Sequence, residues 1–493
     1  MKTSNPSTET SVTKILFPIF MGVFAVVLAI SIETLEYSTA LAITAGLFVG
    51  GIAIYFLNQK AITYISIFTL GLGIPFNLDV NLFFRHYIGV TSVDIGVTFL
   101  SSVVLYIVFY YDRIVSGIKR FYSNRMILFA LVLYMLSGIL SLYNALSKEL
   151  VVLELVRLMF LLIIFYTVMN FGKREYISVF ILTLSICVFL EFLLSFYQFK
   201  TGRLFGLYAF GETRYEFGLG YLQSRVSGTF SHANGLAYFF ELLLPLMFAM
   251  ILVEENKMLK LWYTVVFLFG LYGLIITLSR GGWLATAVSL PIVFLLLFRK
   301  RITEKKFILS LFFGLAAVIV LGVIFYPTIA KRFQAYDYGS AGTRRPLNIA
   351  AISVIKQFPI AGVGMNNFAK VFRTYDTTGG SSLFQTQGLV HNLFLGVWTE
   401  TGTIGIIAFV WIFLSSFIVA IRLLSKVPLW YSGILVGVSA GLLAQIIHGM
   451  FDPGFRVLMS TSMLVYSMIG LIGAVSVLYQ KKEKQPSNKE LNS

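Results

Sequence analysis

Arginine is concentrated in one of the two alternating sets of polar segments that separate the apolar runs of this sequence. That set holds 11 arginines and 5 lysines, whereas the other set holds 7 arginines and 15 lysines. A planar guanidinium binds phosphate oxygens through two parallel hydrogen bonds and stays charged when partly desolvated, whereas lysine acts as a hydrated point charge. The arginine-rich set therefore predicts a phosphate-bearing ligand, with pairing to lipid headgroups as the alternative. Its arginines are Arg85, Arg157, Arg203, Arg214, Arg225, Arg280, Arg332, Arg344, Arg345, Arg373 and Arg456, where Arg157 is counted because it lies inside an apolar run near the end on that side.

Histidine is the second residue type placed to do chemistry. All four histidines, His86, His232, His391 and His448, lie near the ends of apolar runs on the arginine-rich side. A neutral imidazole can take a proton at physiological pH, and nearby arginines favour the neutral form. We expect His391 to be a general base, because it ends a polar segment of 64 residues and begins an apolar run. His232, in Ser231-His-Ala-Asn-Gly, is the rival, and a helix cap is the structural alternative for both.

Glu400 is the carboxylate nearest to His391 in the sequence and competes for the role of base. Nine residues along a helix place it on the opposite side and about 13 Å deeper in the membrane. We therefore expect Glu400 to support a bend at Gly402 instead.

The elements that position these residues are membrane helices. The 493 residues are 58% hydrophobic and only 12% charged, and the mean hydropathy of +0.85 is far outside the range of a soluble domain. Runs of about 20 apolar residues, enough to cross a bilayer, recur as far as Tyr479. We predict an all-α, polytopic integral membrane protein with about fourteen spans. They lie near residues 15–32, 38–57, 61–78, 95–111, 126–143, 151–170, 176–198, 233–252, 261–279, 282–298, 307–326, 391–421, 429–449 and 457–479.

These spans divide the chain into four parts. Residues 1–14 and 480–493 are predicted tails, residues 15–198 an amino-terminal bundle, and residues 199–479 the core that carries the chemistry. The first apolar run is a span rather than a signal peptide, because it is long and no small-residue cleavage site follows it. Cys187 lies inside a span, so neither a disulfide nor a thiolate site is expected.

Basic residues also orient the predicted spans. The segments on the side of both termini carry 22 of the 38 lysines and arginines, mostly in short loops. By the positive-inside rule this side is cytoplasmic. The arginine-rich set then faces outward, and the net charge of +16 requires no nucleic-acid partner.

Four charged residues lie inside predicted spans near their outer ends: Glu154, Arg157, Glu191 and Glu241. A charge at that depth costs up to about 3 kcal/mol, so each is a candidate functional residue. Glu154 and Arg157 are three positions apart on one helix, so they can also neutralise each other as a packing pair.

The longest outer segment, residues 327–390, contains an apolar stripe with helical spacing. The stripe consists of Leu347, Ala350, Ala351, Val354, Ile355 and Phe358. Pro346 suits the first turn of such a helix. Arg344 and Arg345 would then stand at its amino terminus, where backbone N–H groups favour an anion. The alternative is an interfacial helix that lies on lipid.

Four segments resemble the O-antigen ligase and O-antigen polymerase superfamily. They are Arg225-Val-Ser-Gly-Thr-Phe-Ser-His-Ala-Asn-Gly, Thr277-Leu-Ser-Arg-Gly-Gly-Trp, Pro359-Ile-Ala-Gly-Val-Gly-Met-Asn-Asn-Phe and His391-Asn-Leu-Phe-Leu-Gly-Val-Trp-Thr-Glu-Thr-Gly-Thr-Ile-Gly. The resemblance covers roughly residues 225–421. It implies a bacterial inner-membrane enzyme that moves glycan from an undecaprenyl diphosphate carrier to a hydroxyl of an acceptor glycan or glycolipid, without metal or another cofactor.

With such a donor, we expect Arg225, Arg280, Arg344 and Arg345 to bind the carrier diphosphate. Arg280 ends a span, and the two glycines after it would let backbone or ligand approach closely. Fixed arginines can stabilise the charge that develops on the leaving diphosphate, as a divalent metal does elsewhere. The outer acids show no metal-ligand spacing. Snorkelling to the interface is the alternative for Arg280.

The leading hypothesis is therefore a metal-independent, inverting glycosyltransferase, with a transporter of an anion or a lipid-linked saccharide as the alternative. A transporter needs a site that both faces can reach, yet the spans carry no comparable polar residues in their cytoplasmic halves. A structural scaffold would explain the spans but not the outer arginines. Polymerases and ligases share this donor, so both stay open.

Overall fold

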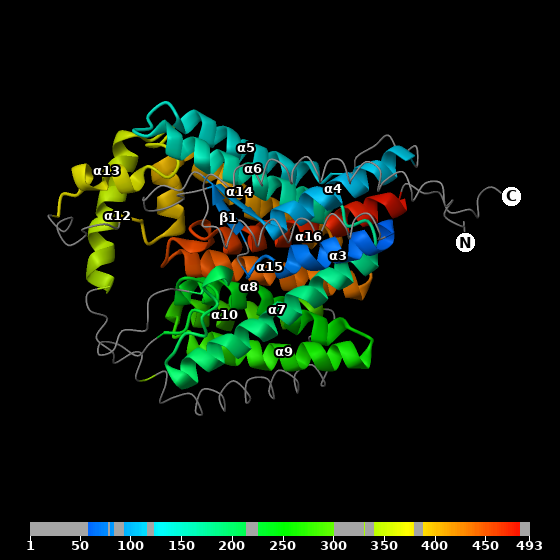
Figure 1. Cartoon of the computed structure of the whole chain (residues 1–493). Helices are drawn as coiled ribbons and strands as arrows, with labels where there is room; N and C mark the ends of the chain where they lie inside the picture. Colours follow the sequence, from blue (N-terminus) through cyan, green and yellow to red (C-terminus); the bar gives the residue numbers. More distant parts are fainter. Residues whose placement is uncertain are drawn as a thin grey trace, which may run out of the picture.

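The computed structural model describes residues 58–76, 79–82, 93–115, 123–212, 225–299, 330, 340–378 and 388–483. The predicted spans near residues 15–32, 38–57 and 307–326 lie outside these residues, as do residues 1–14 and the chain after residue 483. The described part is almost entirely helical (Figure 1).

Thirteen α-helices account for most of the described residues. Their bounds are α3 (Gln59–Leu72), α4 (Val97–Val115), α5 (Arg125–Ser141), α6 (Lys148–Met169), α7 (Arg174–Thr201), α8 (Ala233–Val253), α9 (Lys257–Ile276), α10 (Arg280–Leu297), α12 (Ser340–Gln357), α13 (Phe368–Tyr375), α14 (Leu393–Leu423), α15 (Leu429–Gly449) and α16 (Met459–Glu483). Two 3-10 turns, η1 (Tyr208–Phe210) and η3 (Gly454–Arg456), lie in the connections.

Eight of the described helices are long and apolar enough to cross a membrane: α6 to α10 and α14 to α16. The prediction of a polytopic helical membrane protein is confirmed. Three further predicted spans coincide with α3, α4 and α5, which fall outside this group, and α3 and α5 have only 14 and 17 residues.

One small hairpin departs from the all-α prediction. The strand β1 (Asp79–Leu82) pairs antiparallel with β2 (Val93–Gly96) in the connection between α3 and α4. The predicted spans near residues 61–78 and 95–111 therefore reach too far into this connection. Each of these two apolar runs continues from a helix into the connection, and the second run includes part of β2. Hydropathy alone does not distinguish a helix from an adjoining apolar strand or turn.

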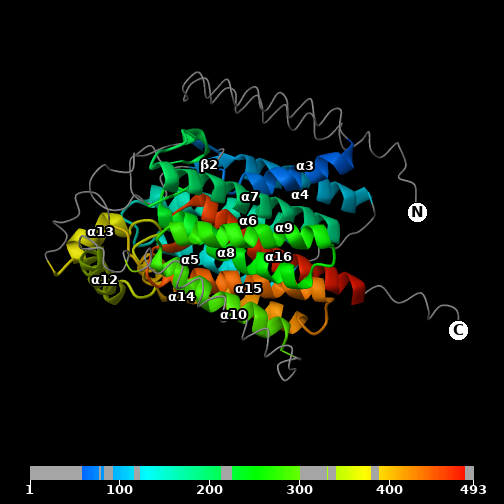
Figure 2. The ribbon, with the colours of Figure 1, turned by 90° about the horizontal axis from the view of Figure 1, so that it is seen from below.

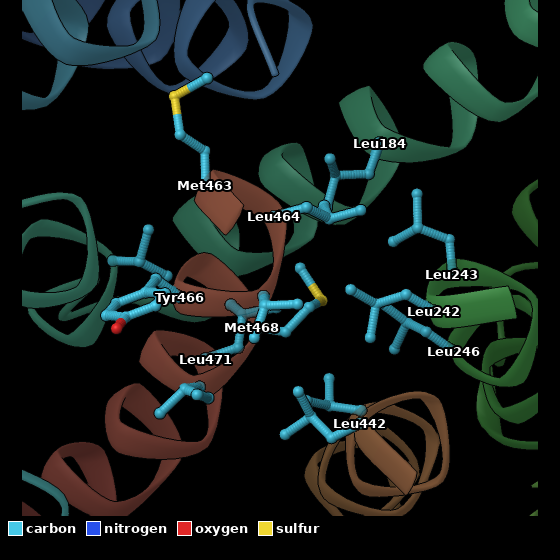
Figure 3. Close-up of a cluster of buried hydrophobic side chains, with 14 of the residues drawn as sticks. Leu184, Leu242, Leu243, Leu246, Leu442, Met463, Leu464, Tyr466, Met468 and Leu471 are labelled. Atoms are coloured by element: carbon cyan, nitrogen blue, oxygen red, sulfur yellow. The ribbon is translucent and has the colours of Figure 1, made fainter. Parts of the chain in front are cut away.

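Helices α8 and α16 form the centre of the bundle. In their most apolar stretches, 83% of α8 and 94% of α16 is buried, against 33% of α9 and 28% of α10. Figure 3 shows Leu242, Leu246, Leu442 and Leu464 among the side chains that meet between α8, α15 and α16. Gly441 allows α15 to approach α8, because a Cβ there would lie 2.2 Å from the carbonyl oxygen of Leu242. Small residues at helix contacts are a common means of close packing in membranes.

Helix α14 bends at Gly402, the predicted position, where φ is 66° and ψ is −169°. The segment before α13 bonds to backbone groups around the bend. The N–H of Thr403 donates to the carbonyl of Pro359 at 2.7 Å, and the N–H of Gly364 donates to the carbonyl of Glu400 at 3.0 Å. These bonds satisfy polar groups that the helix no longer pairs and fix the crossing segment against α14.

Helices α12 and α13 lie together beyond one end of the bundle, which we call the cap end (Figures 1 and 2). The apolar stripe predicted for residues 347–358 lies on α12 and packs against α13 and the chain before α14. The buried residues of this contact are Leu347, Ala350, Ala351, Val354, Val363, Phe368, Phe372 and Val390. The segment that contains His391 is thereby packed against the cap.

The predicted start of the cap helix is wrong. Helix α12 begins at Ser340, so Pro346 lies inside the helix rather than in its first turn. Arg344 and Arg345 consequently sit more than one turn from the helix amino terminus, where the unpaired N–H groups are found. Proline removes one N–H from the helix ladder, and the helix can continue on its amino-terminal side with a local kink.

Candidate functional site

The predicted site residues gather at the cap end, where several helices begin. His391 directly precedes Asn392, the N-cap of α14, and His232 is the N-cap of α8. The charges of Arg225 and His391 both act on the His232 imidazole, and the charge of Arg344 acts on His391. Two predicted arginines and both candidate bases therefore share one electrostatic environment.

His391 has the properties of a proton acceptor. Burial lowers the pKa of its imidazole, the charge of Asp452 raises it, and the charge of Arg344 lowers it, with a net lowering. Its Nδ1 atom is buried and has no hydrogen-bond partner among the described residues. The neutral form expected from the sequence is therefore favoured, although burial rather than arginine charge is the main cause.

His232 is committed to holding a helix end. Its Nδ1 atom accepts a hydrogen bond of 3.1 Å from the N–H of Asn234 and so caps α8. Neighbouring protein atoms partly desolvate the exposed His232 ring and lower its pKa, and the charge of Arg225 lowers it further. Because one ring nitrogen holds the cap, the structure favours His391 over His232 as the candidate base.

Arg225 is anchored by two hydrogen bonds. Its Nε–H donates to the carbonyl of Thr277 at 3.0 Å, and its Nη2–H donates to Oδ1 of Asn234 at 2.7 Å. The guanidinium plane is therefore fixed between the start of α8 and the turn that precedes α10. A fixed fork of this kind is suited to phosphate oxygens, because little further ordering is needed on binding.

Asn234 and Asp452 are site residues that sequence reasoning missed. The Asn234 side chain donates to Oδ2 of Asp452 at 2.7 Å while its oxygen accepts from Arg225. The loop that carries Asp452 is tied to the start of α14, because the Asn392 side chain donates to the carbonyl of Met450 at 3.1 Å. Asp452 thus links the anchored arginine to the His391 segment. Asn234 lies within the family-like segment that begins at Arg225, whereas nothing in the sequence placed Asp452 beside it.

Arg280 begins α10, directly after the N-cap Ser279. The two glycines that follow it were expected to admit backbone or ligand, and this expectation is wrong. A Cβ on Gly281 would lie 2.3 Å from Cδ2 of His448, and a Cβ on Gly282 would lie 3.2 Å from Oε2 of Glu241. The glycine pair therefore makes room for two buried side chains of the protein itself.

Arg344 and Arg345 differ in their surroundings although they are adjacent. Arg344 is half-buried, and its charge acts on His391 and on Tyr238. Arg345 is exposed. The structure therefore joins Arg344 to the cluster at the cap end, and burial distinguishes it from its neighbour.

Arg157 and Glu400 belong to a second cluster of charges. Arg157 Nη1 lies 3.3 Å from Oε2 of Glu154, Arg456 Nε lies 3.8 Å from Oε1 of Glu154, and Arg456 Nη2 bonds Oε2 of Glu400. Arg157 also donates to Oγ of Ser462 at 2.5 Å. Two arginines and two glutamates leave no net charge, and the cluster joins α6, η3, α14 and α16.

A small cavity of about 40 Å³ lies beside this second cluster. Its lining includes Val390, Asn392, Pro453 and the paired Glu400 and Arg456. Val390 and Asn392 flank His391 in the sequence, and Pro453 follows Asp452. Residues next to both side chains therefore line the same cavity. A volume of this size suits a water molecule or a hydroxyl group.

Within the described residues, no group of three or more histidines, cysteines, aspartates or glutamates is arranged to hold a metal ion. The site at the cap end contains the anchored Arg225, the half-buried imidazole of His391 and the carboxylate of Asp452. Such an arrangement can bind an anion through Arg225 and take a proton at His391.

Part of the chain matches a known protein family. Residues 265–410 match the O-antigen ligase family. The match includes the quoted motifs that carry Arg280 and His391, whereas the motif that begins at Arg225 precedes it. A comparison with curated proteins finds no match. The resemblance to the O-antigen ligase and polymerase superfamily that the sequence indicates is confirmed over residues 265–410.

Proposed function

We propose that this chain is a metal-independent, inverting glycosyltransferase that moves glycan from an undecaprenyl diphosphate carrier to a hydroxyl group of an acceptor glycan or glycolipid. The family match supports glycan transfer in general. The observation that carries the specific proposal is that the anchored Arg225 and the half-buried His391, whose Nδ1 atom is buried, both act on the same end of the bundle through the Asn234–Asp452 contact. This arrangement offers a cation for a lipid diphosphate and a base for an acceptor hydroxyl.

The reaction that fits these residues is a single displacement. The acceptor oxygen attacks the anomeric carbon, and the bond between that carbon and the diphosphate oxygen breaks with its electron pair staying on the diphosphate. His391 takes the proton of the attacking hydroxyl. Arg225, Arg280 and Arg344 stabilise the negative charge that grows on the leaving diphosphate. Attack opposite to the leaving group inverts the anomeric configuration.

The proposed topology places this chemistry on the outer face of a bacterial inner membrane. About fourteen spans, an even number, put both termini in the cytoplasm. The cap of α12 and α13 then faces outward, where a carrier diphosphate at the membrane surface meets a glycan in water. Polymerases and ligases differ in the acceptor, which is a second lipid-linked glycan for one and a glycolipid for the other.

Reconstitution tests the proposal. The purified full chain is placed in proteoliposomes with a labelled undecaprenyl diphosphate oligosaccharide and bacterial lipid acceptors, in the presence of EDTA. We expect label to appear on longer or acceptor-linked glycan, with release of undecaprenyl diphosphate. Movement of intact labelled lipid between leaflets without chemical change would contradict the proposal and support a transporter. Loss of transfer in EDTA that added divalent metal restores would contradict metal independence.

A further inference from the structure

A chain of hydrogen bonds runs from Arg225 into the interior of the bundle. Arg225 Nη2 lies 2.7 Å from Oδ1 of Asn234, and the same oxygen lies 3.1 Å from Oγ of Ser279. Ser279 Oγ lies 3.4 Å from Nε2 of His448, whose Nδ1 lies 2.9 Å from Oε2 of Glu241. The chain ties together α8, the start of α10 and the end of α15.

Asp452 fixes the direction of these hydrogen bonds. A carboxylate only accepts, so the Asn234 group 2.7 Å from Asp452 is the amide nitrogen, and its oxygen faces Arg225 and Ser279. Ser279 gives its single proton to that oxygen and can then only accept from His448. Although serine, histidine and glutamate follow one another here as in a hydrolase triad, Ser279 is not activated as a nucleophile, because its proton is directed away from the imidazole.

Glu241 and His448 are placed as an ion pair, with Nδ1 of the imidazole against the carboxylate. Oε1 of Glu241 accepts from Nε2 of Gln445 at 3.0 Å, and Oε2 lies 2.9 Å from Nδ1 of His448. With Glu241 ionised both of its oxygens accept, and the imidazole then donates at both nitrogens and carries a positive charge. The ring of Tyr238 stacks on it at 4.1 Å between centroids, which suits a cation. All three side chains are buried, at 3% exposure or less.

We propose that Glu241 and His448 are positioning residues for the donor diphosphate. Acting through Ser279 and Asn234, the buried pair holds the Arg225 guanidinium in its binding orientation. The pair also fills the space left by Gly281 and Gly282, so it sets the first turn of α10 that carries Arg280. The inference rests on the proposed function, because the ligand of these arginines is the carrier diphosphate.

The test is a binding measurement on the purified full chain. Undecaprenyl diphosphate is titrated against the wild type and Glu241→Gln, which keeps the shape but removes the charge that makes the imidazole donate at both nitrogens. We expect affinity to fall about 3- to 10-fold, the equivalent of one hydrogen bond. Glu254→Gln is the matched control, since Glu254 is a buried acid at the other end of α8 that accepts from Trp430 Nε1 at 3.0 Å. It should leave affinity unchanged.

A double-mutant cycle separates positioning from a merely structural role. If Glu241 acts through Arg225, the effect of Glu241→Gln disappears in an Arg225→Gln background. Asn234→Ala, which breaks the same chain at another point, should behave likewise and serves if Glu241→Gln does not fold. Equal losses in both backgrounds, or wild-type affinity in both Glu241→Gln and Asn234→Ala, would overturn the inference. Failure of the wild type to bind undecaprenyl diphosphate would instead contradict the proposed function.

Discussion

The described residues contain two clusters of charged and polar side chains that include both arginine and glutamate, and the two clusters differ in where their arginines lie. The cluster around Arg225 begins with an ion pair in the bundle and leads to half-buried arginines at the cap end. The cluster of Glu154, Arg157, Glu400 and Arg456 closes on itself, with two acids balancing two arginines.

This difference suggests that one cluster binds the donor and the other joins helices. Arg225 is half-buried at the cap end, where the carbonyl of Thr277 and the side-chain oxygen of Asn234 hold its guanidinium. A cation that lies against carboxylates, as Arg456 lies against Glu400 and Glu154, is already compensated. We therefore assign donor binding to the first cluster and helix joining to the second, including Arg157, which the sequence left open between the two roles.

The largest effect is expected at His391. His391→Ala should lower turnover about 10²- to 10⁴-fold, the usual cost of losing a general base, because the acceptor hydroxyl then keeps its proton during attack. Donor affinity should hardly change, since the diphosphate is bound by arginines. The measurement is turnover of a labelled oligosaccharide donor together with a donor titration.

His232→Ala is the comparison for that experiment. It removes the side-chain cap of α8, so we expect a stability loss of about 1 kcal/mol and a much smaller effect on turnover. An active His391→Ala protein, or a larger turnover loss in His232→Ala, would show that the base has been assigned to the wrong histidine.

The closed cluster should affect stability most. Arg157→Met leaves the buried carboxylate of Glu154 with only the longer contact to Arg456, and removing one partner of a buried pair typically costs about 3 to 5 kcal/mol. Thermal unfolding in detergent should therefore begin at a lower temperature, while the folded fraction binds donor normally. Weaker donor binding with unchanged unfolding would move Arg157 into the binding cluster.

Arg280 tests the geometry of anion binding. Arg280→Lys keeps a positive charge at the start of α10 but loses the planar fork, so we expect donor affinity to fall about 10-fold or more. Arg203→Lys changes an exposed arginine after α7 in the same way and should have no effect. Normal affinity in both proteins would make Arg280 an interface anchor.

The smallest expected effect is a shift in pH dependence. The charge of Arg344 lowers the pKa of His391 and that of Asp452 raises it. The base is active when neutral, so kcat/KM falls as pH drops through this pKa. Arg344→Gln should move the acid limb to higher pH, and Asp452→Asn should move it to lower pH. Arg345→Gln, which alters the exposed neighbour, should leave the profile in place.

Hydropathy and local motifs predicted the membrane helices and several candidate site residues. They did not predict the contacts between residues far apart in the sequence. Apolar runs identify the membrane helices, because burial in lipid requires about 20 such residues in a row. The bond between Asn234 and Asp452 joins positions 218 residues apart, and Arg456 meets Glu400 across 56 residues. Helix packing decides which distant charges form pairs. The spacing of residues along the chain does not predict that packing. Pro346 was misleading for a similar reason, because a favoured position in the first turn does not exclude a later one.

The most direct test of the contrast between the two clusters compares Arg225→Gln with Arg456→Gln in one experiment. Undecaprenyl diphosphate affinity and thermal unfolding are measured on both purified proteins beside the wild type. We predict that Arg225→Gln weakens binding about 10- to 150-fold, the cost of a lost hydrogen bond to a charged group, with little change in unfolding. Arg456→Gln should unfold at a lower temperature and bind donor with wild-type affinity. The reverse pattern, or the same change in both properties for both proteins, would contradict the division into a binding cluster and a packing cluster.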